Sequence, residues 1–138
     1  MIAYLDSSVL LRKLLGQPGA LKEWGRIEAG VVSAIAEVEC LRTLDRVRIL
    51  EEVPDTEMAI RRETVYRLLE SVEVVEPSRA VLARSAQPMP TVLGTLDAIH
   101  LATALLWREN TGSDLVMATH DGSLALAARA VGFRLIGA

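Results

Sequence analysis

The sequence of 138 residues has a single cysteine, Cys40, and few aromatic residues: two Trp, two Tyr and one Phe. One cysteine excludes an intramolecular disulfide and a zinc site built from cysteines. Because Cys40 lies near Val38 and Leu41 in a helical pattern, we expect its thiol to be buried. With so few aromatic side chains, the hydrophobic core must consist mainly of Val, Leu, Ile and Ala.

Long hydrophobic segments are also missing. No segment approaches the ~20 apolar residues that cross a bilayer, and Asp6 interrupts the apolar run at the N-terminus. This pattern is typical of neither a signal peptide nor a membrane anchor, so we expect a cytoplasmic protein without membrane contacts. With 51% hydrophobic and 24% charged residues, residues 1–138 are predicted to form one domain with one sizeable core.

An excess of basic residues is absent too. The 15 basic and 18 acidic residues give a net charge of −3, and 13 of the basic residues are arginines. This balance excludes nucleic-acid binding through a broadly basic surface. A localised nucleic-acid site stays open, because acidic residues that hold a metal add negative formal charge at a neutralised site. Arginine also suits bidentate contacts to phosphate.

Short apolar runs alternate with helical patterns, which predicts an α/β fold with a parallel sheet, helices on both faces and right-handed crossovers. The expected strands are residues 2–5, 31–32, 72–75, 115–118 and 133–136. The expected helices are residues 8–15, 20–27, 34–50, 55–69, 78–86, 95–108 and 121–131. Residues 87–94 contain two prolines and form the longest predicted loop.

Three of these helices carry more specific expectations. Ser33 should cap the helix at 34–50, and Asp55 should cap the next helix, which is expected to run antiparallel to it. The helix at 95–108 has Ala, Leu, Ile and Thr on every side, so we expect it to be buried nearly all round. The apolar stripe predicted for the helix at 34–50 consists of Ile35, Val38, Leu41, Leu44 and Val47.

Four acidic residues occur where predicted strands end or predicted helices begin. Asp6 follows the first strand, and Asp121 follows the fourth. Glu39 lies about a turn and a half into the helix that leaves the second strand, and Asp97 opens the buried helix. Because open parallel sheets bind ligands at the carboxyl ends of their strands, we expect the four carboxylates to meet at one edge of the sheet.

Each acid also has an ordinary structural explanation. Asp6 and Asp121 occupy positions typical of helix N-caps, and Asp97 could cap its helix together with Thr95. Glu39 could form an ion pair with an arginine further along its helix, at Arg42 or Arg46.

The two histidines are close to these acids in the sequence. His100 lies one turn beyond Asp97 in the buried helix, and we interpret it as a packed or hydrogen-bonded core histidine rather than a metal ligand. His120 precedes Asp121 and could border the site, but no role is assigned to it. Other acids are interpreted as solvated charges without a role: Glu37, Asp45, Glu51, Glu52 and Glu109.

Convergence of the four carboxylates would be costly without a cation. At roughly 6 Å, each pair repels by about 3 kcal/mol at an effective dielectric near 20. Six such pairs approach the whole free energy of unfolding of a domain, ~5–15 kcal/mol. The acids therefore either stay apart or hold divalent cations, and oxygen ligands favour Mg²⁺ or Mn²⁺. Such sites commonly act on phosphate esters, because the metal activates a bound water and neutralises charge on the phosphate.

Four segments of the chain match a known family in their residues and in their order. They are Tyr4-Leu5-Asp6-Ser7-Ser8-Val9-Leu10, Ser33 with Glu39 six positions on, Leu96-Asp97-Ala98-Ile99-His100-Leu101-Ala102-Thr103-Ala104, and Thr119-His120-Asp121 before Leu124-Ala125-Leu126-Ala127-Ala128-Arg129-Ala130-Val131-Gly132. Together they resemble a PIN domain, and most closely the VapC-type ribonuclease toxins of prokaryotic toxin–antitoxin pairs. The resemblance covers essentially the whole chain, and the blocks around Asp97 and Asp121 are its most specific part.

The resemblance implies a three-layer α/β/α sandwich, a parallel sheet of about five strands and a metal-dependent endoribonuclease site that uses Mg²⁺ or Mn²⁺. The implied catalytic and metal-binding quartet is Asp6, Glu39, Asp97 and Asp121. Glu39 is preferred to Glu37 because of its distance from Ser33. Ser7 and Thr119 would position water, metal or phosphate. The family further implies an RNA substrate, a homodimer and a small antitoxin whose tail enters the active-site groove.

Two other functions stay open. The first is another Mg²⁺-dependent phosphohydrolase or a phospho-receiver. A haloacid-type phosphatase needs a second aspartate where this chain has Ser8, and a receiver needs a late lysine, whereas only Lys13 and Lys22 are present. The second is an interaction module that keeps the fold without chemistry. The presence of all four acids counts against this module.

Overall fold

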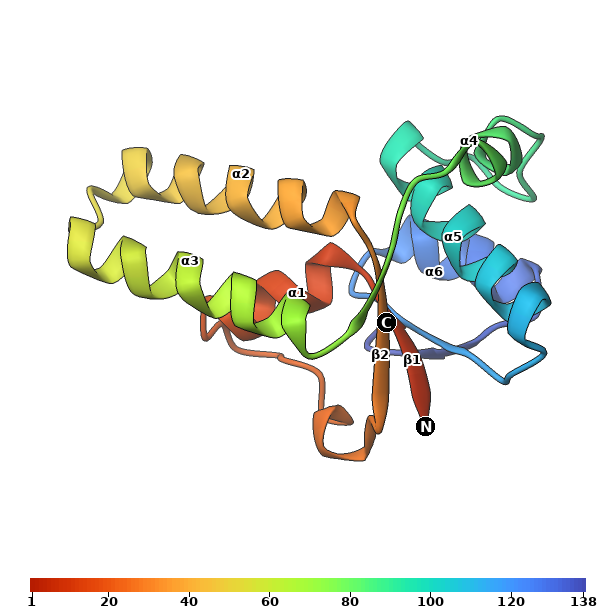
Figure 1. Ribbon diagram of the computed structural model, residues 1–138, viewed down its shortest axis with the longest axis horizontal. Coiled ribbons are helices and arrows are strands. Elements are labelled where there is room, and N and C mark those ends of the chain that lie inside the picture. Colours follow the sequence, from red (N-terminus) through yellow and green to blue (C-terminus); the bar gives the residue numbers. More distant parts are fainter.

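The computed structural model describes residues 1–138, and its centre is a five-stranded parallel sheet with helices on both faces (Figure 1). The strands are β1 (Ile2–Leu5), β2 (Ala29–Ser33), β3 (Glu73–Val75), β4 (Val116–Ala118) and β5 (Arg134–Ile136). The helices are α1 (Ser7–Leu14), α2 (Ile35–Glu51), α3 (Asp55–Glu70), α4 (Arg79–Ser85), α5 (Thr95–Thr111) and α6 (Gly122–Ala130). The predicted three-layer α/β/α fold is confirmed.

The strand order places β1 and β4 side by side at the centre of the sheet. The order is β3-β2-β1-β4-β5, so the chain builds outward from β1 in one direction and then returns to build in the other. Leu5 at the end of β1 pairs with Ala118 at the end of β4. In sheets of this kind, ligands bind at the carboxyl ends of the strands where the direction reverses. The topology therefore points to the residues that follow Leu5 and Ala118.

The two faces of the sheet carry separate hydrophobic clusters. Helices α1 to α3 lie on one side of the sheet and α4 to α6 on the other (Figure 1). Side chains of β1 alternate between the clusters, so that Ala3 and Leu5 belong to the first and Tyr4 to the second. Strand β1 is thus buried on both faces, which explains its continuous apolar sequence.

The prediction of a helix at 20–27 is wrong. This segment contains only a 3₁₀ turn at Trp24–Arg26, and the backbone is extended at Ile27, just before β2. Leu21 is buried and Ile27 packs against the first cluster, so contacts with the core set the path of this segment. Gly25 lies within the turn and disfavours a helix by about 1 kcal/mol relative to alanine.

Helix α2 buries a narrower face than the predicted stripe. Ala36, Cys40 and Leu44 are buried at a spacing of four residues, which confirms the buried thiol. Val38, which the prediction placed in the stripe, is 60% exposed. Packing against α1 and α3 covers only one strip of the helix, so the face with Val38 stays in solvent. Three members of the predicted stripe are half-buried: Ile35, Leu41 and Val47.

The caps differ between the two helices of this hairpin. Ser33 Oγ accepts a hydrogen bond from the Ile35 N–H at 3.2 Å, as predicted. Asp55 is not a cap, because the extended Pro54 occupies the N-cap position of α3. As the first helical residue, Asp55 still interacts favourably with the helix dipole.

The remaining predicted elements are confirmed with shifts of a few residues at their ends. Helix α5 has seven buried residues between Ala98 and Leu105, which confirms the expected burial there, whereas Thr95 and Leu96 in its first turn are exposed. No helix combines the length and hydrophobicity that a bilayer crossing needs.

Candidate active site

The carboxylate of Asp6 is held by two hydroxyl groups. Asp6 follows β1 and is only 4% exposed. Its Oδ2 accepts hydrogen bonds from Ser8 Oγ at 2.7 Å and from Thr119 Oγ1 at 2.9 Å. Asp6 occupies the N-cap position of α1, but its side chain makes no capping hydrogen bond. The N-cap explanation is therefore wrong for this side chain, which instead binds the residue that follows β4.

Thr119 joins the ends of β1 and β4. Its buried hydroxyl donates to Asp6, 113 residues away in the sequence, and accepts the N–H of Asp121 at 3.0 Å. Ser8 Oγ also accepts the N–H of His120 at 2.9 Å. These contacts tie the start of α1 to the loop between β4 and α6, and they bring Asp6 and Asp121 to the same edge of the sheet.

Glu39 reaches the same place from α2. Its Oε1 accepts a hydrogen bond from Ser7 Oγ at 2.7 Å and lies 2.6 Å from His100 Nε2. Burial alone would raise the pKa of Glu39, but the hydrogen bond and charge of His100, together with Ser7, lower it below its ordinary value. Glu39 makes no ion pair with Arg42 or Arg46, because its oxygen is bound to His100 instead.

His100 connects these acids with the core. Its ring is fully buried, Nδ1 lies 2.7 Å from the Tyr4 hydroxyl, and Nε2 lies 3.5 Å from Asp6 Oδ1. Burial lowers the pKa of a histidine, but the hydrogen bond to Glu39 and the charge of Asp6 outweigh it, so the pKa of His100 is raised. The interpretation as a hydrogen-bonded core histidine is confirmed, yet its contact with the acids was missed. The available signal was a polar ring one turn after Asp97 in a buried helix.

Asp97, in the first turn of α5, has different surroundings. Its side chain is half-buried and accepts no hydrogen bond from the chain, so the cap shared with Thr95 is not formed. Burial and the nearby charges of Asp121 and Asp6 raise the pKa of Asp97, while His100 opposes them in part. This carboxylate therefore lies among negative charges that the protein does not fully neutralise.

Asp121 is both an N-cap and a neighbour of Asp97. Its Oδ1 accepts the N–H of Ser123 at 2.8 Å and the N–H of Leu124 at 3.1 Å, which caps α6. The N-cap explanation is thus correct for Asp121. Its Oδ2 makes no hydrogen bond, and its charge acts on Asp97 more strongly than that of any other residue. Capping therefore does not remove Asp121 from the acidic group.

We call the four residues the acidic cluster: Asp6, Glu39, Asp97 and Asp121. Hydrogen bonds connect Ser7 and Thr119 with its first two members, and charge interactions connect the other two members with them. Glu37, the alternative to Glu39, makes no hydrogen bond or ion pair with any of these groups. The structure thus brings all the residues singled out in the sequence to one edge of the sheet.

The acidic cluster fits a hard divalent cation in its chemistry. Carboxylate and hydroxyl oxygens are the ligands that Mg²⁺ and Mn²⁺ prefer. The raised pKa of Asp97 reports negative charge that a cation would compensate. In the present side-chain positions, no three His, Cys, Asp or Glu residues lie close enough together to coordinate one metal ion. Binding therefore requires shifts of the side chains, and Asp97 is the member least restrained by hydrogen bonds.

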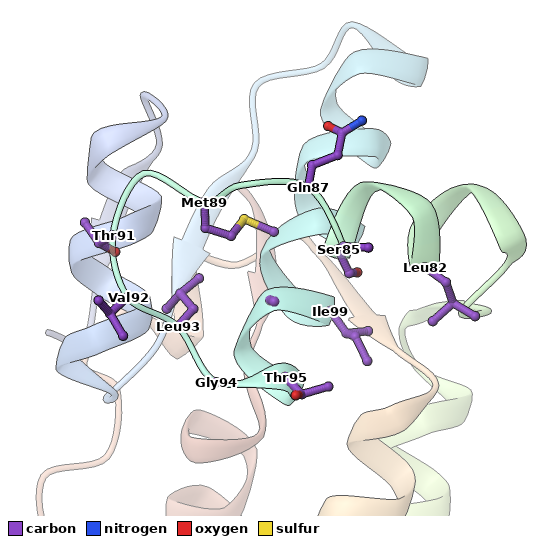
Figure 2. Close-up of a pocket in the computed structure, with 12 residues that line it drawn as sticks. Leu82, Ser85, Gln87, Met89, Thr91, Val92, Leu93, Gly94, Thr95 and Ile99 are labelled. Atoms are coloured by element: carbon purple, nitrogen blue, oxygen red, sulfur yellow. The ribbon is translucent and has the colours of Figure 1, made fainter.

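The largest cavity lies near the acidic cluster but does not include it. It has a volume of about 550 Å³ and is formed by α4, the loop after it and the first turns of α5 (Figure 2). Its lining contains no acidic residue and is mainly apolar, with Leu82, Met89, Val92 and Ile99 among its members. Val92 in the loop is 94% exposed. This surface suits an apolar contact rather than catalysis.

Comparisons with known proteins agree with this geometry. Residues 3–129 match the family model of the PIN domain. Ribonuclease VapC46 of Mycobacterium tuberculosis is 32% identical over 137 residues, which cover 96% of this chain and 95% of that protein. Ribonuclease VapC47 of the same species is 29% identical over 133 residues, 94% of this chain and 92% of that protein.

The fold of this chain is also similar to that of a solved structure. A toxin–antitoxin complex from Klebsiella pneumoniae contains a chain that superimposes with a TM-score of 0.65 at 20% sequence identity. The superposition covers 89% of this chain and 90% of that chain. At this identity the likeness concerns the arrangement of helices and strands.

Proposed function

Because the chain belongs to the PIN domain family, we propose that it is a VapC-type toxin, a cytoplasmic Mg²⁺- or Mn²⁺-dependent endoribonuclease. Both similar proteins from M. tuberculosis bear the name ribonuclease. The observation that carries the proposal is the meeting of four carboxylates at the carboxyl edge of the sheet, where Asp97 keeps charge that its neighbours do not neutralise. RNA phosphodiesters are the substrate that such a site and this family favour.

The proposal gives each residue of the site a task. The three aspartates of the acidic cluster would hold the metal, and Glu39 would hold it or orient the water that attacks the phosphate. A bound divalent ion lowers the pKa of a water ligand and neutralises the charge that develops on the phosphate. Ser7 keeps Glu39 in place, and Thr119 does the same for Asp6.

His100 and Tyr4 act as positioning residues in this proposal. The Nε2–H of His100 donates to Glu39, and Nδ1 is hydrogen-bonded to the Tyr4 hydroxyl. Both side chains are fully buried, so this chain of hydrogen bonds is shielded from water. Glu39 is thereby oriented from inside the core, without contact between Tyr4 and the substrate.

RNA cleavage in Mg²⁺, Mn²⁺ and EDTA tests the proposal. We expect the wild-type protein to cleave single-stranded RNA with either ion and to stop in EDTA, and Asp6→Asn and Asp97→Asn to be inactive. Asp114→Asn is the control, because Asp114 is an exposed residue paired with Arg134 before β4 begins. Metal-dependent cleavage by both Asp6→Asn and Asp97→Asn would refute the site. A wild-type protein without cleavage would favour the inactive interaction module.

We further propose a homodimer and a small antitoxin as partners. The similar fold from K. pneumoniae comes from a toxin–antitoxin complex. The apolar cavity between α4 and α5, with exposed Leu82 and Val92, is a suitable surface for a second copy of the chain. Light scattering should show a dimer that Val92→Asp converts to a monomer. Ile60→Asp, at an exposed position of α3, should leave the dimer intact.

A further inference from the structure

A second cavity, of about 370 Å³, opens beside the acidic cluster. Six of its seven lining residues come from α2, and the seventh, Leu96, comes from the first turn of α5. Glu39 belongs to both the cavity and the acidic cluster. We propose that this cavity binds the nucleotide next to the scissile phosphate, with Arg42 and Arg46 on its phosphate and Val38 and Leu96 against its base. The inference rests on the proposed ribonuclease function and assigns it a substrate subsite.

The apolar part of this subsite is open to solvent. Val38 is 60% exposed and Leu96 is 51% exposed. Neither side chain belongs to a core cluster, and α2 turns Ala36, Cys40 and Leu44 inward in place of Val38. Apolar surface beside a charged site is stabilised when a ligand covers it. A nucleobase has a flat apolar face that can do so.

The charged part of this subsite has more arginines than acids. Arg42 and Asp45 form one ion pair at 3.1 Å, but Asp45 is also bound by Arg48 at 2.8 Å. Arg46, one turn from Arg42, forms no ion pair or hydrogen bond. With Arg42 and Arg46 against Glu39, the lining of this cavity carries more positive than negative charge next to the acidic cluster. This is where a phosphate of a bound strand requires positive charge.

Helix α3 provides an internal comparison for this charge. Arg61 is paired with Glu57 at 2.7 Å, and Arg67 is paired with Glu63 at 2.7 Å, each at a spacing of four residues. These arginines have carboxylates of their own on the same helix. The third arginine of α3, Arg62, has no carboxylate partner and contacts the Tyr66 hydroxyl at 3.4 Å. What distinguishes α2 is that Arg42 and Arg46 line one cavity together with Glu39.

An RNA strand fits the cavity better than an acidic peptide does. A strand whose scissile phosphate lies at the acidic cluster must place its neighbouring phosphate within a nucleotide of Glu39. Flat bases stack on a surface without hydrogen bonds to their edges, and such binding tolerates any base. Thr43 is the one neutral polar residue of the lining. We therefore expect little base preference at this position.

Fluorescence anisotropy with a short labelled single-stranded RNA tests the subsite in EDTA, where metal-dependent cleavage is off. The double variant Arg42→Gln/Arg46→Gln should weaken binding about tenfold or more near 0.15 M salt. The slope of log K against log salt should become shallower by about 0.7, from the loss of one neutralised phosphate. Val38→Ser should weaken binding a few-fold and leave this slope unchanged.

The matched control is Arg61→Gln/Arg67→Gln on α3, which removes the same charge and should keep both affinity and slope. Unchanged binding by Arg42→Gln/Arg46→Gln would overturn the subsite, and so would an equal loss in the control. If the α2 double variant kept RNA binding and lost only the antitoxin, the cavity would be a protein-binding site and the proposal wrong. A wild-type protein that binds RNA through these arginines without cleaving it would support the subsite and overturn the ribonuclease function alone.

Discussion

The acidic cluster has two sides with different surroundings. On the side of β1 and α2, Asp6 and Glu39 are bound by hydroxyl groups and by His100, which come from several elements of the fold. On the side of α5 and α6, Asp97 accepts no hydrogen bond, and Asp121 binds only backbone N–H groups of its own helix. The protein thus provides hydrogen-bond partners for the carboxylates on the first side. On the second side it leaves the carboxylates short of positive charge.

Under the proposed function, this difference separates two tasks within one site. The β1–α2 side is held in place before any ligand arrives, as a preorganised catalytic group must be. The α5–α6 side keeps oxygens free and a raised pKa at Asp97, which is the condition under which a cation stabilises the fold most. Substitutions on the two sides should therefore have different consequences.

The largest expected effect is the loss of cleavage in Asp97→Asn. Its carboxylate has no structural bond to lose, so the fold should survive while kcat/KM for RNA falls about 10³-fold or more, since metal ions contribute several kcal/mol to such reactions. Cleavage assays in Mg²⁺ with circular dichroism would measure both. Cleavage activity within tenfold of wild type would show that Asp97 is not part of the active site. Asp114→Asn serves as the control.

On the β1–α2 side, the largest structural effect is expected from Thr119→Val. The substitution removes one of the two hydroxyls that bind Asp6 and leaves the N–H of Asp121 without a partner, so it should lower the free energy of unfolding by about 1–3 kcal/mol. Thr64→Val, at an exposed hydroxyl bonded only within its own helix, should cost less than about 0.5 kcal/mol. Urea denaturation of both variants makes the comparison. Equal losses in the free energy of unfolding would show that the Thr119 hydroxyl contributes no more than an exposed one.

A smaller effect is expected from Tyr4→Phe, which removes the 2.7 Å contact with His100 Nδ1. The free energy of unfolding should fall by about 0.5–1.5 kcal/mol. Because Glu39 loses its orientation, kcat should fall a few-fold while KM for RNA stays unchanged. Tyr66→Phe, at an exposed position of α3, is the matched control. A change in KM alone would contradict a positioning role.

The smallest effect concerns the stability of Asp97→Asn without metal. The folded pKa of Asp97 is raised, so its charged form costs stability, and this cost grows as pH rises from the unfolded value through the folded one. In EDTA at neutral pH, Asp97→Asn should therefore be slightly more stable than wild type, and the difference should vanish in acid. Because Asp97 is half-buried, solvent screening keeps the gain modest. Urea denaturation across pH measures it, and a loss of stability in EDTA would contradict the comparison.

Most of the fold was predictable because its strands are short apolar runs between helical patterns. Asp6 and Asp121 could be placed together since both follow strands of one parallel sheet. Local pattern was less informative where distant contacts decide the structure. The segment at 20–27 follows the core rather than its own periodicity, and Val38 is exposed because α1 and α3 cover only one strip of α2.

The acids themselves were predictable, but their hydrogen-bond partners were not. Ser7 and Glu39 are 32 residues apart, and Glu39 and His100 are 61 residues apart. No spacing rule along the chain relates such pairs, because they meet only when α1, α2 and α5 pack together. The contrast between Asp6 and Asp97 is likewise invisible in the sequence, where both are aspartates at the start of a helix.

The bond from the Asp6 N–H to the Ala118 carbonyl and the contact between Asp6 and Thr119 link the beginning of the chain to its fourth strand. Asp6 and Thr119 are 113 residues apart, so Asp6 has neither partner until the chain has closed this long loop. The carboxylates of Asp6 and Asp121 therefore reach one edge of the sheet only after β1 and β4 have paired.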